Sequence, residues 1–491
     1  MEPKNLYFGG GAAASVFSPI ALAVVLLAGL LVIFLPRNKI VVPVLLVGML
    51  LPINQILLVG GLHFPMFRVL ATFGIVRMGW AKIFGTDKIC SGGMNGIDWA
   101  LIILTVFTAI DGALLWESQA EVVYQLGNAY TAFGLYFLLR YSIRDEEDVR
   151  RALRAMVWVV AIVAPAMIYE HFSGNNLFYR FLGGLHAAKL EHTAARDGFF
   201  RAQGPFGHPI IAGTFGGFMV PLFVALWKGE KRDRKYALLG MLSAAAIPFA
   251  VASSTALFAL LGGIGALCLW PMRRKMRLLR WGIVGTLAAG QLYMTSPVWH
   301  LIDDVSLSAD SSSYHRYELV NECILHFWDW ALIGTKNFAS WGWDMWDLAN
   351  QYVATADTAG LIPLIAFIAI LVFGFRYIGK ARRHYEGNKQ EEFFVWAIGG
   401  SLFANVVGFF GIGYWDQVIV AWYMVLAIIA AITLSARAAI AVPAAAPALG
   451  HQPRASVAPS PALRMGLERE KHARPQAHGT GRFGRFDARE R

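Results

Sequence analysis

The chain alternates long apolar runs with short segments that contain most of its charged, Pro and Gly residues. Runs of about twenty apolar residues have the length that a helix needs to cross roughly 30 Å of hydrocarbon. These runs are continuously apolar rather than alternating, which excludes a transmembrane barrel. The pattern predicts an all-α polytopic membrane protein of about 12–13 transmembrane helices. The predicted spans lie near 17–35, 40–60, 65–84, 97–116, 120–140, 152–171, 209–227, 236–252, 256–271, 281–297, 359–377, 393–413 and 417–435.

Composition supports this class. Of the 491 residues, 57% are hydrophobic and 15% charged, whereas an ordinary soluble domain has about 25% charged residues. This balance excludes a soluble globular enzyme. The segment 65–84 is the exception among the spans, because it contains Arg68, Arg77 and Lys82. It is also compatible with a helix that lies in the membrane interface.

The positions of the basic residues predict the orientation of the chain. Lys and Arg beside a span are retained on the cytoplasmic side. Two long connections, 172–208 and 298–358, contain only four and two basic residues. We therefore expect both to face outward, as a first outer loop and a large outer loop that contains short helices. Four other connections contain five Lys or Arg each and are expected inside: 140–154, 228–235, 273–280 and 376–392.

The net charge of +11 does not indicate a nucleic-acid partner, because it is concentrated at one end of the chain. Residues 437–491 contain ten Lys or Arg and four Asp or Glu in a Pro/Ala-rich sequence. Such a composition cannot bury a core. We predict a transmembrane domain over 1–437 and a disordered, basic cytoplasmic tail over 438–491. Contact of this tail with anionic lipid headgroups is the alternative.

The first outer loop ends in a Gly/Pro-rich turn, Arg201 to Pro209, directly before a span. Glycine lets backbone approach a ligand closely, and the N-terminus of the next helix offers free N–H groups to an anion. Arg201 and His208 lie beside this helix start. The simpler interpretation is a turn that interrupts a helix, with the Arg201 side chain reaching lipid phosphates.

The large outer loop contains nine acidic residues but only two basic ones, Arg316 and Lys336. Helical spacing of its apolar residues after Ser313 predicts an amphipathic helix with Arg316 in the first turn. A structural role for Arg316 would be an ion pair with Glu318 or Glu322.

Aromatic residues and amides follow this helix. Trp341, Trp343 and Trp346 precede the run Asn350-Gln351-Tyr352. Tryptophans at this position are typical of the interfacial aromatic belt. The alternative is a sugar-binding surface, in which rings contact sugar C–H faces and polar groups accept from hydroxyls.

Other chemistry lacks sequence support. There is no Gly-rich nucleotide loop, no His/Cys metal cluster and no Gly-x-Ser-x-Gly motif, so no cofactor or metal is expected. Cys90, Cys268 and Cys323 are too scattered for a zinc site, and no intrachain disulfide is expected. Asp111 lies within a predicted span, where a carboxylate is costly unless it has a partner. It is either an ion or proton site, or a structural group satisfied by Gln125 and Asn128.

Over roughly residues 150–375 the sequence resembles the O-antigen ligase and polysaccharide polymerase superfamily of bacterial membrane glycosyltransferases. The resemblance rests on the order and spacing of several short elements. These are the turn from Arg201 to Pro209, Ser253-Ser254 between two short spans, Ser313-x-x-Arg316, Ile333-Gly334, Asp347-x-x-Asn350-Gln351-Tyr352, and Gly360-Leu361.

The resemblance implies transfer of a glycan from an undecaprenyl-diphosphate carrier to a sugar hydroxyl, without metal or nucleotide, at the outer face of the bacterial inner membrane. Arg201 and Arg316 match the family arginines, so the resemblance implies that they bind the diphosphate. Arginine forks match phosphate oxygens in bidentate geometry. Asn350, Gln351 and Tyr352 would contact the glycan. Membrane lipids are expected partners, as are a chain-length regulator or other polysaccharide-assembly proteins.

Two positions depart from the ligase pattern. Ala349 occupies the place of the histidine that many ligases carry before the Asn, and Thr255 the place of an arginine between the paired spans. The base that takes the acceptor proton would therefore be Asp347, His315 or His208. These departures favour a polymerase-like or otherwise divergent member. A solute transporter that uses Asp111 is the alternative function, and a scaffold that binds through the basic tail is a third.

Overall fold

The computed structural model describes residues 17–53, 55–85, 88–183, 198–304 and 313–441. Helices make up most of this part of the chain, as the apolar runs predict. The predicted tail falls almost entirely outside the described residues. By length and composition, five described helices can cross a membrane: Gly96–Trp116, Glu146–Ser173, Pro209–Lys228, Leu361–His384 and Gln417–Ser435.

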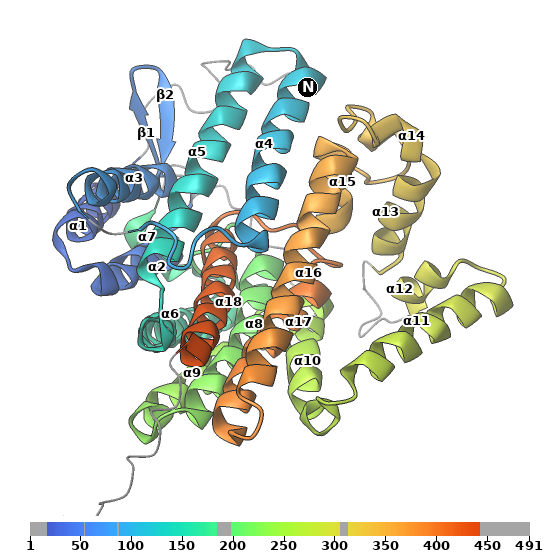
Figure 1. Ribbon diagram of the computed structural model, residues 1–491. Helices are drawn as coiled ribbons and strands as arrows, with labels where there is room; N and C mark the ends of the chain where they lie inside the picture. The colour runs from blue at the N-terminus through green and yellow to red at the C-terminus, as the bar shows by residue number, and fades with distance from the viewer. Residues whose placement is uncertain (1–16, 54, 86–87, 184–197, 305–312, 442–491) are drawn as a thin grey trace, which may run out of the picture. The chain divides into compact units, whose positions relative to one another are not determined.

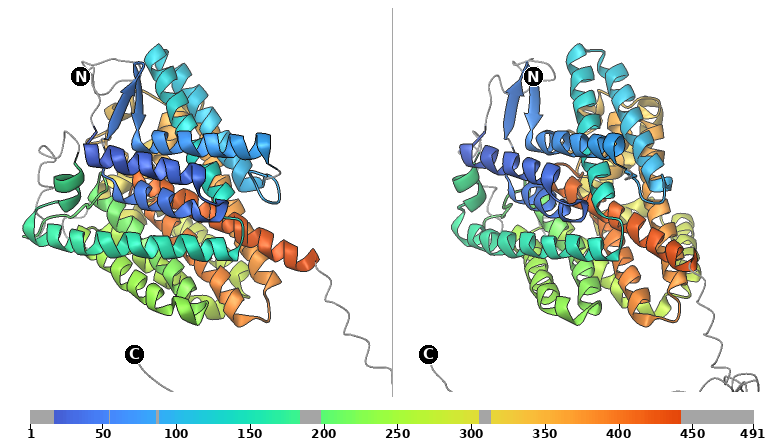
Figure 2. Two further views of the ribbon diagram at one scale, coloured as in Figure 1. Left: turned by 90° about the vertical axis from the view of Figure 1, so that its left-hand side faces the viewer. Right: turned by 60° about the vertical axis from the view of Figure 1, so that its left-hand side comes forward.

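One predicted span is wrong. The run 40–60 is not a continuous helix: α2 ends at Leu50, and Leu51 is extended because Pro52 follows it. A two-stranded antiparallel hairpin comes next, with Gly60 and Gly61 at positive φ in its turn. The helices α1, α2 and α3 lie side by side (Figure 2). Their bounds and those of the strands are α1 Pro19–Phe34, α2 Val41–Leu50, β1 Ile56–Val59, β2 Leu62–Pro65 and α3 Met66–Phe84.

Side-chain caps fix where the next helices begin. Asn95 and Asp98 form a reciprocal capping box at the start of α4. Ser118 and Asp145 each accept a backbone N–H at the starts of α5 and α6. α4 and α5 form an antiparallel pair (Figure 1). The bounds are α4 Gly96–Trp116, α5 Gln119–Ser142, α6 Glu146–Ser173 and α7 Leu177–Leu182.

Helix α8 is the most buried of the candidate spans. A Cβ added at Gly216 would lie 2.7 Å from the carbonyl oxygen of Ala244, and one at Gly217 2.8 Å from the amide of Leu260. The two glycines therefore let α8 approach α9 and α10 backbone to backbone. The bounds are α8 Pro209–Lys228, α9 Arg234–Val251, α10 Ser254–Cys268, α16 Leu361–His384, α17 Lys389–Gly408 and α18 Gln417–Ala441.

Helix α11 (Met276–Tyr293) differs from these helices, because it lies apart from the others and has no buried residue (Figure 1). Trp281 and Leu278 on it are 65% and 71% exposed. Leu261 of α10 and Phe403 of α17 are likewise 53% and 41% exposed.

The large outer loop folds into short helices, as expected. Leu319, Met345 and Val353 form part of a small apolar core of their own. The predicted helix with Arg316 in its first turn is confirmed as α13. The bounds are α12 Leu301–Asp304, α13 Ser313–Leu325, α14 Phe327–Trp330 and α15 Gln351–Ala359.

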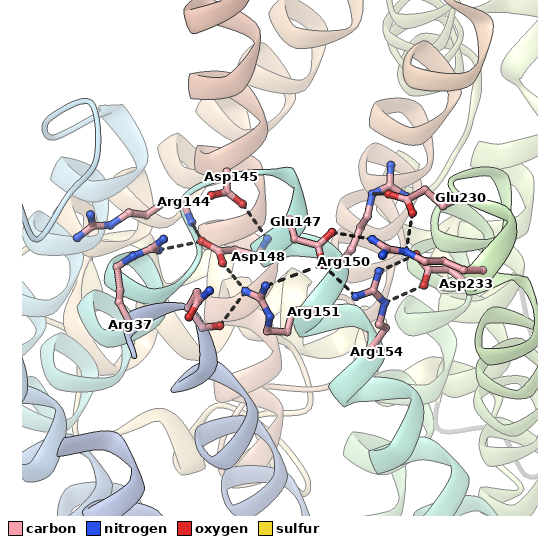
Figure 3. Close-up of polar contacts among 12 residues, drawn as sticks. Arg37, Arg144, Asp145, Glu147, Asp148, Arg150, Arg151, Arg154, Glu230 and Asp233 are labelled. Carbon is pink, nitrogen blue, oxygen red and sulfur yellow. Dashed lines mark hydrogen bonds and ion pairs between the residues drawn. The ribbon is translucent and has the colours of Figure 1, made fainter. Parts of the chain in front are cut away.

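The four basic connections meet at one end of the helices, which we call the charged end. Buried Asp148 accepts from Arg37 at 2.8 Å and from Arg151 at 2.6 Å (Figure 3). Asp233 binds the Arg154 guanidinium through both of its oxygens, at 2.7 and 3.1 Å. Further ion pairs and hydrogen bonds join the four basic segments to one another: Arg150–Glu230, Arg273–Glu392, Arg382–Glu392, and Gln390 with the carbonyl of Gly229.

Candidate functional site

The turn 201–209 is held by three other segments. The Glu170 carboxylate of α6 accepts the backbone N–H groups of Gln203 at 3.2 Å and Gly204 at 2.9 Å. Gly204 has φ +60°, a conformation that favours glycine. The amide nitrogen of Gln417, at the start of α18, donates to the carbonyl of Pro205 at 2.6 Å. The backbone N–H of Ala202 donates to the last turn of α9. The turn is thus a fixed part of the fold.

Gly207 lies against the short turn 409–416 between α17 and α18. A Cβ at Gly207 would be 2.5 Å from both Asp416 Oδ2 and a ring carbon of Trp415. Burial raises the pKa of the Asp416 carboxyl to about 8, and its buried Oδ2 accepts no hydrogen bond from the described residues. Asp416 is not among the site residues predicted from the sequence, although an acid in a short turn between two apolar spans is a recognisable signal.

His208 is the N-cap of α8. Its Nδ1 accepts the backbone N–H of Ile210 at 3.2 Å, so in the neutral ring Nε2 carries the proton. Burial lowers the pKa of His208 to about 4, and the positive charge of Arg201 adds to this effect. Arg201 and His208 therefore lie together, as predicted, and the imidazole is neutral at pH 7.

Arg316 lies in the wall of a cavity of about 180 Å³. The residue is only 7% exposed. The rest of the wall comes from α10, α12, α13 and the end of α17, and includes Phe258, Val407 and Phe410. Thr255 lines the same cavity. We call this space the Arg316 cavity.

His315, Arg316 and Asp347 lie together in a single cluster. His315 Nε2 donates to the backbone carbonyl of Asp347 at 3.0 Å, which leaves its buried Nδ1 as an acceptor without a partner among the described residues. Burial raises the pKa of the Asp347 carboxyl, and the positive charge of Arg316 opposes this shift.

Asn350, Gln351 and Tyr352 bind backbone rather than line the Arg316 cavity. Asn350 caps α15 by accepting the N–H groups of Tyr352 and Val353. Gln351 Oε1 accepts the N–H of Tyr414 at 2.6 Å, and its own N–H donates to the carbonyl of Phe409 at 2.8 Å. The Tyr352 hydroxyl donates to the carbonyl of Val406 at 3.2 Å. These contacts fix the 409–416 turn; a role in glycan binding stays a prediction.

Asp357 on α15 is a second acid whose setting the sequence did not reveal. It is 1% exposed. Burial raises the pKa of its carboxyl to about 8, and an interaction with the Cys323 thiol opposes the shift. Within the described residues, no three His, Cys, Asp or Glu side chains come together as a metal ion would require.

The chain matches no protein-family model, and no curated protein sequence matches it. The site must therefore be interpreted from its own geometry. Two groups of predicted residues, Arg201 with His208 and Arg316 with His315 and Asp347, both adjoin the 409–416 turn. The first does so through Gly207, and the second through Phe410 and Gly411 of the Arg316 cavity.

Proposed function

We propose that this protein is a membrane glycosyltransferase that joins lipid-linked oligosaccharide units in the synthesis of a bacterial cell-surface polysaccharide. The donor would be a glycan on undecaprenyl diphosphate, and the acceptor a sugar hydroxyl of another lipid-linked unit or of a lipid core. The enzyme would be polymerase-like or ligase-like, in the inner membrane with its large loops outside. Nothing in the proposed reaction requires a metal or nucleotide.

The observation that carries this proposal is the position of Arg316, a buried arginine in the wall of a cavity that is otherwise lined largely by apolar residues. A guanidinium can bind phosphate oxygens through two parallel hydrogen bonds. A lipid diphosphate supplies an anion joined to a long hydrocarbon chain. The helices α10 and α17 contribute to the wall of the Arg316 cavity and also carry the exposed Leu261 and Phe403, apolar surface that suits such a chain.

In the proposed step, the acceptor oxygen bonds to the anomeric carbon while the bond from that carbon to the diphosphate oxygen breaks. The diphosphate leaves with the electron pair, and its growing charge is stabilised by Arg316. The acceptor proton goes to a nearby base. His208 is the weakest candidate, because its pKa is about 4 and its Nδ1 is engaged by Ile210. Asp347 and His315 remain the candidates for the base that accepts this proton.

The charged end supports the proposed orientation. It gathers the four basic connections that the positive-inside rule assigns to the cytoplasm. The turns 201–209 and 409–416 lie at the other ends of the same helices. The donor diphosphate would therefore meet Arg316 at the outer membrane surface.

The alternative function, a solute transporter, would depend on the carboxylate of Asp111. It is 5% exposed, and its buried Oδ2 has no hydrogen-bond partner among the described residues. However, Asp111 lines none of the cavities described for this structure. Asp111→Asn should therefore leave polysaccharide synthesis intact, whereas a transporter that depends on this carboxylate would lose solute flux in vesicles.

The proposal is tested by Arg316→Ala in cells that depend on this protein for their long-chain polysaccharide. We expect polymer yield to fall on the order of 100-fold or more, as when a transition-state donor is removed. Carrier-linked single units should accumulate in the lipid extract. Arg316→Lys should recover only part of the yield, because an ammonium lacks the bidentate fork.

The matched control is Arg274→Ala, which removes an arginine that is 67% exposed and far along the chain from the site. Its polymer yield should equal that of the unmodified protein. Normal polymer length and yield with Arg316→Ala, in protein that reaches the membrane at the usual level, would contradict the proposal.

A further inference from the structure

A second and larger cavity, of about 600 Å³, lies on the other side of the 409–416 turn from the Arg316 cavity. Its walls come from α3, α4, α5, α15, α16, the turn itself and the start of α18. We call it the large cavity. Its volume lies within the range of about 300–1,000 Å³ that is typical of sites for small organic ligands.

The lining of the large cavity is mostly uncharged. Among the described residues that line it, only Arg68 and Asp416 are of charged types. The Arg68 guanidinium is already engaged, because it donates to the His63 carbonyl and to the Thr131 hydroxyl. An anionic ligand would therefore find little free positive charge.

Neutral hydrogen-bonding groups and aromatic rings share the rest of the surface. Thr105 and Thr108 of α4 face the cavity with Asn128 of α5, and rings come from Tyr414, Trp415 and Trp422. Hydroxyl and amide groups can both donate and accept, as sugar hydroxyls require. Aromatic rings provide large flat apolar surfaces that suit the C–H faces of a sugar. This combination indicates a neutral carbohydrate.

The two cavities share a wall that is a single turn of chain. Phe410 and Gly411 line the Arg316 cavity, whereas Phe409 and Tyr414 line the large one. Gln351 holds the turn in place through its bonds to Phe409 and Tyr414. A reaction between two bulky substrates needs such an arrangement, in which each has its own site and the reacting atoms meet at the boundary.

We propose that the large cavity binds the acceptor as a neutral glycan and directs its reacting hydroxyl past the 409–416 turn toward the donor at Arg316. This inference rests on the proposed function, since it assigns the second substrate of the same transfer. It concerns the sugar units of the acceptor, and the aromatic and amide groups named above are the residues that would recognise them.

The first experiment replaces Ala129, which lines the large cavity on α5, with a photo-crosslinking amino acid in cells that make the polysaccharide. Leu126, 61% exposed on the same helix, receives the same residue as the control. After irradiation, the purified protein should carry a sugar-containing adduct at Ala129 and none at Leu126. Adducts at Ala129 that contain phospholipid without sugar, or no adduct at all, would overturn the inference.

The second experiment fills the cavity with Ala132→Leu, with Leu126→Ala as the matched control on the exposed side. We expect polymer yield to fall at least 10-fold for Ala132→Leu alone. A photo-crosslinker at Phe258, in the Arg316 cavity, should still capture a diphosphate lipid in that variant. Unchanged yield, in a variant with unaltered membrane level and melting temperature, would contradict an acceptor site here.

These readouts separate the two proposals. If Arg316→Ala leaves the polymer normal, the proposed function fails whatever Ala129 captures. If Arg316→Ala abolishes polymer but Ala129 captures no sugar, the transferase proposal stands and the assignment of the large cavity is wrong.

Discussion

Charged residues at the two ends of the helices differ in their surroundings. At the charged end, single carboxylates form ion pairs with two arginines from different segments: Asp148 with Arg37 and Arg151, and Glu392 with Arg273 and Arg382. At the opposite end, Asp357 and Asp416 are buried carboxyls with raised pKa values. Asp357 interacts with the Cys323 thiol, and Oδ2 of Asp416 accepts no hydrogen bond from the described residues. Acids of the charged end thus form ion pairs with arginines, whereas Asp357 and Asp416 are buried acids held with raised pKa values.

The difference separates structural charge from charge available for chemistry. Ion pairs that join several segments fix the relative positions of those segments and leave no group free to react. An isolated buried acid costs folding free energy, and such groups are concentrated at functional sites. Groups available for chemistry are therefore expected at the end opposite the charged end, where Arg316 and Asp347 also lie.

The largest expected effect tests the structural role of the charged end. Asp148→Ala should lower the free energy of unfolding by about 3–5 kcal/mol, because it leaves Arg37 and Arg151 close together without their shared carboxylate. Denaturant unfolding in detergent micelles measures this. A loss below about 1 kcal/mol would mean that the network in Figure 3 does not hold the segments together.

A pH-dependent effect, which is smaller over any one pH unit, tests the buried acids. The pKa of Asp357 is raised from 3.8 to about 8, so between these values the folded protein binds a proton that the unfolded chain does not. Stability should therefore be highest at low pH and fall by up to about 1.4 kcal/mol per pH unit between about pH 4 and about pH 8.

Asp357→Asn keeps the shape of the neutral carboxyl and should remove this contribution. Melting temperatures measured from pH 5 to pH 9 should then decline less steeply than those of the unmodified protein, and the stability advantage of the variant should grow with pH up to about pH 8. Identical pH profiles would show that Asp357 does not carry the proton.

The smallest effect is expected at the solvent-exposed edge of the charged end. Arg274 and Glu386 form a 3.1 Å ion pair but are 67% and 47% exposed. Glu386→Ala should change the free energy of unfolding by less than about 1 kcal/mol, because water screens exposed pairs. Comparison with Asp148→Ala under the same conditions measures how much burial adds. Equal losses would remove the distinction between buried and exposed pairs.

Apolar periodicity was sufficient to predict much of the helical fold. The starts of α8 and α13 follow from Pro209 and from the spacing after Ser313, and both helices form. The run 40–60 misled because apolar character alone does not distinguish a helix from a strand. There Pro52 and the Gly60-Gly61 pair carried the correct information.

The sequence predicted individual residues of the candidate site but not the contacts between distant segments that assemble it. Sequence spacing placed His315 and Arg316 on one helix, and the structure adds Asp347 beside them. It could not show that Gln351 binds Tyr414, 63 residues away, or that Gly207 contacts Asp416. Such contacts depend on how helices pack, and no local pattern encodes them.

The separation of α11 from its neighbours has a mechanical consequence. Without buried side chains, α11 can shift with little loss of packing free energy, whereas the glycine-mediated contacts of α8 allow no comparable movement. The protein is therefore more easily deformed around α11 than around α8. Under the proposed function, the lipid-linked donor would enter and leave past α11, while the helices around α8 keep their arrangement.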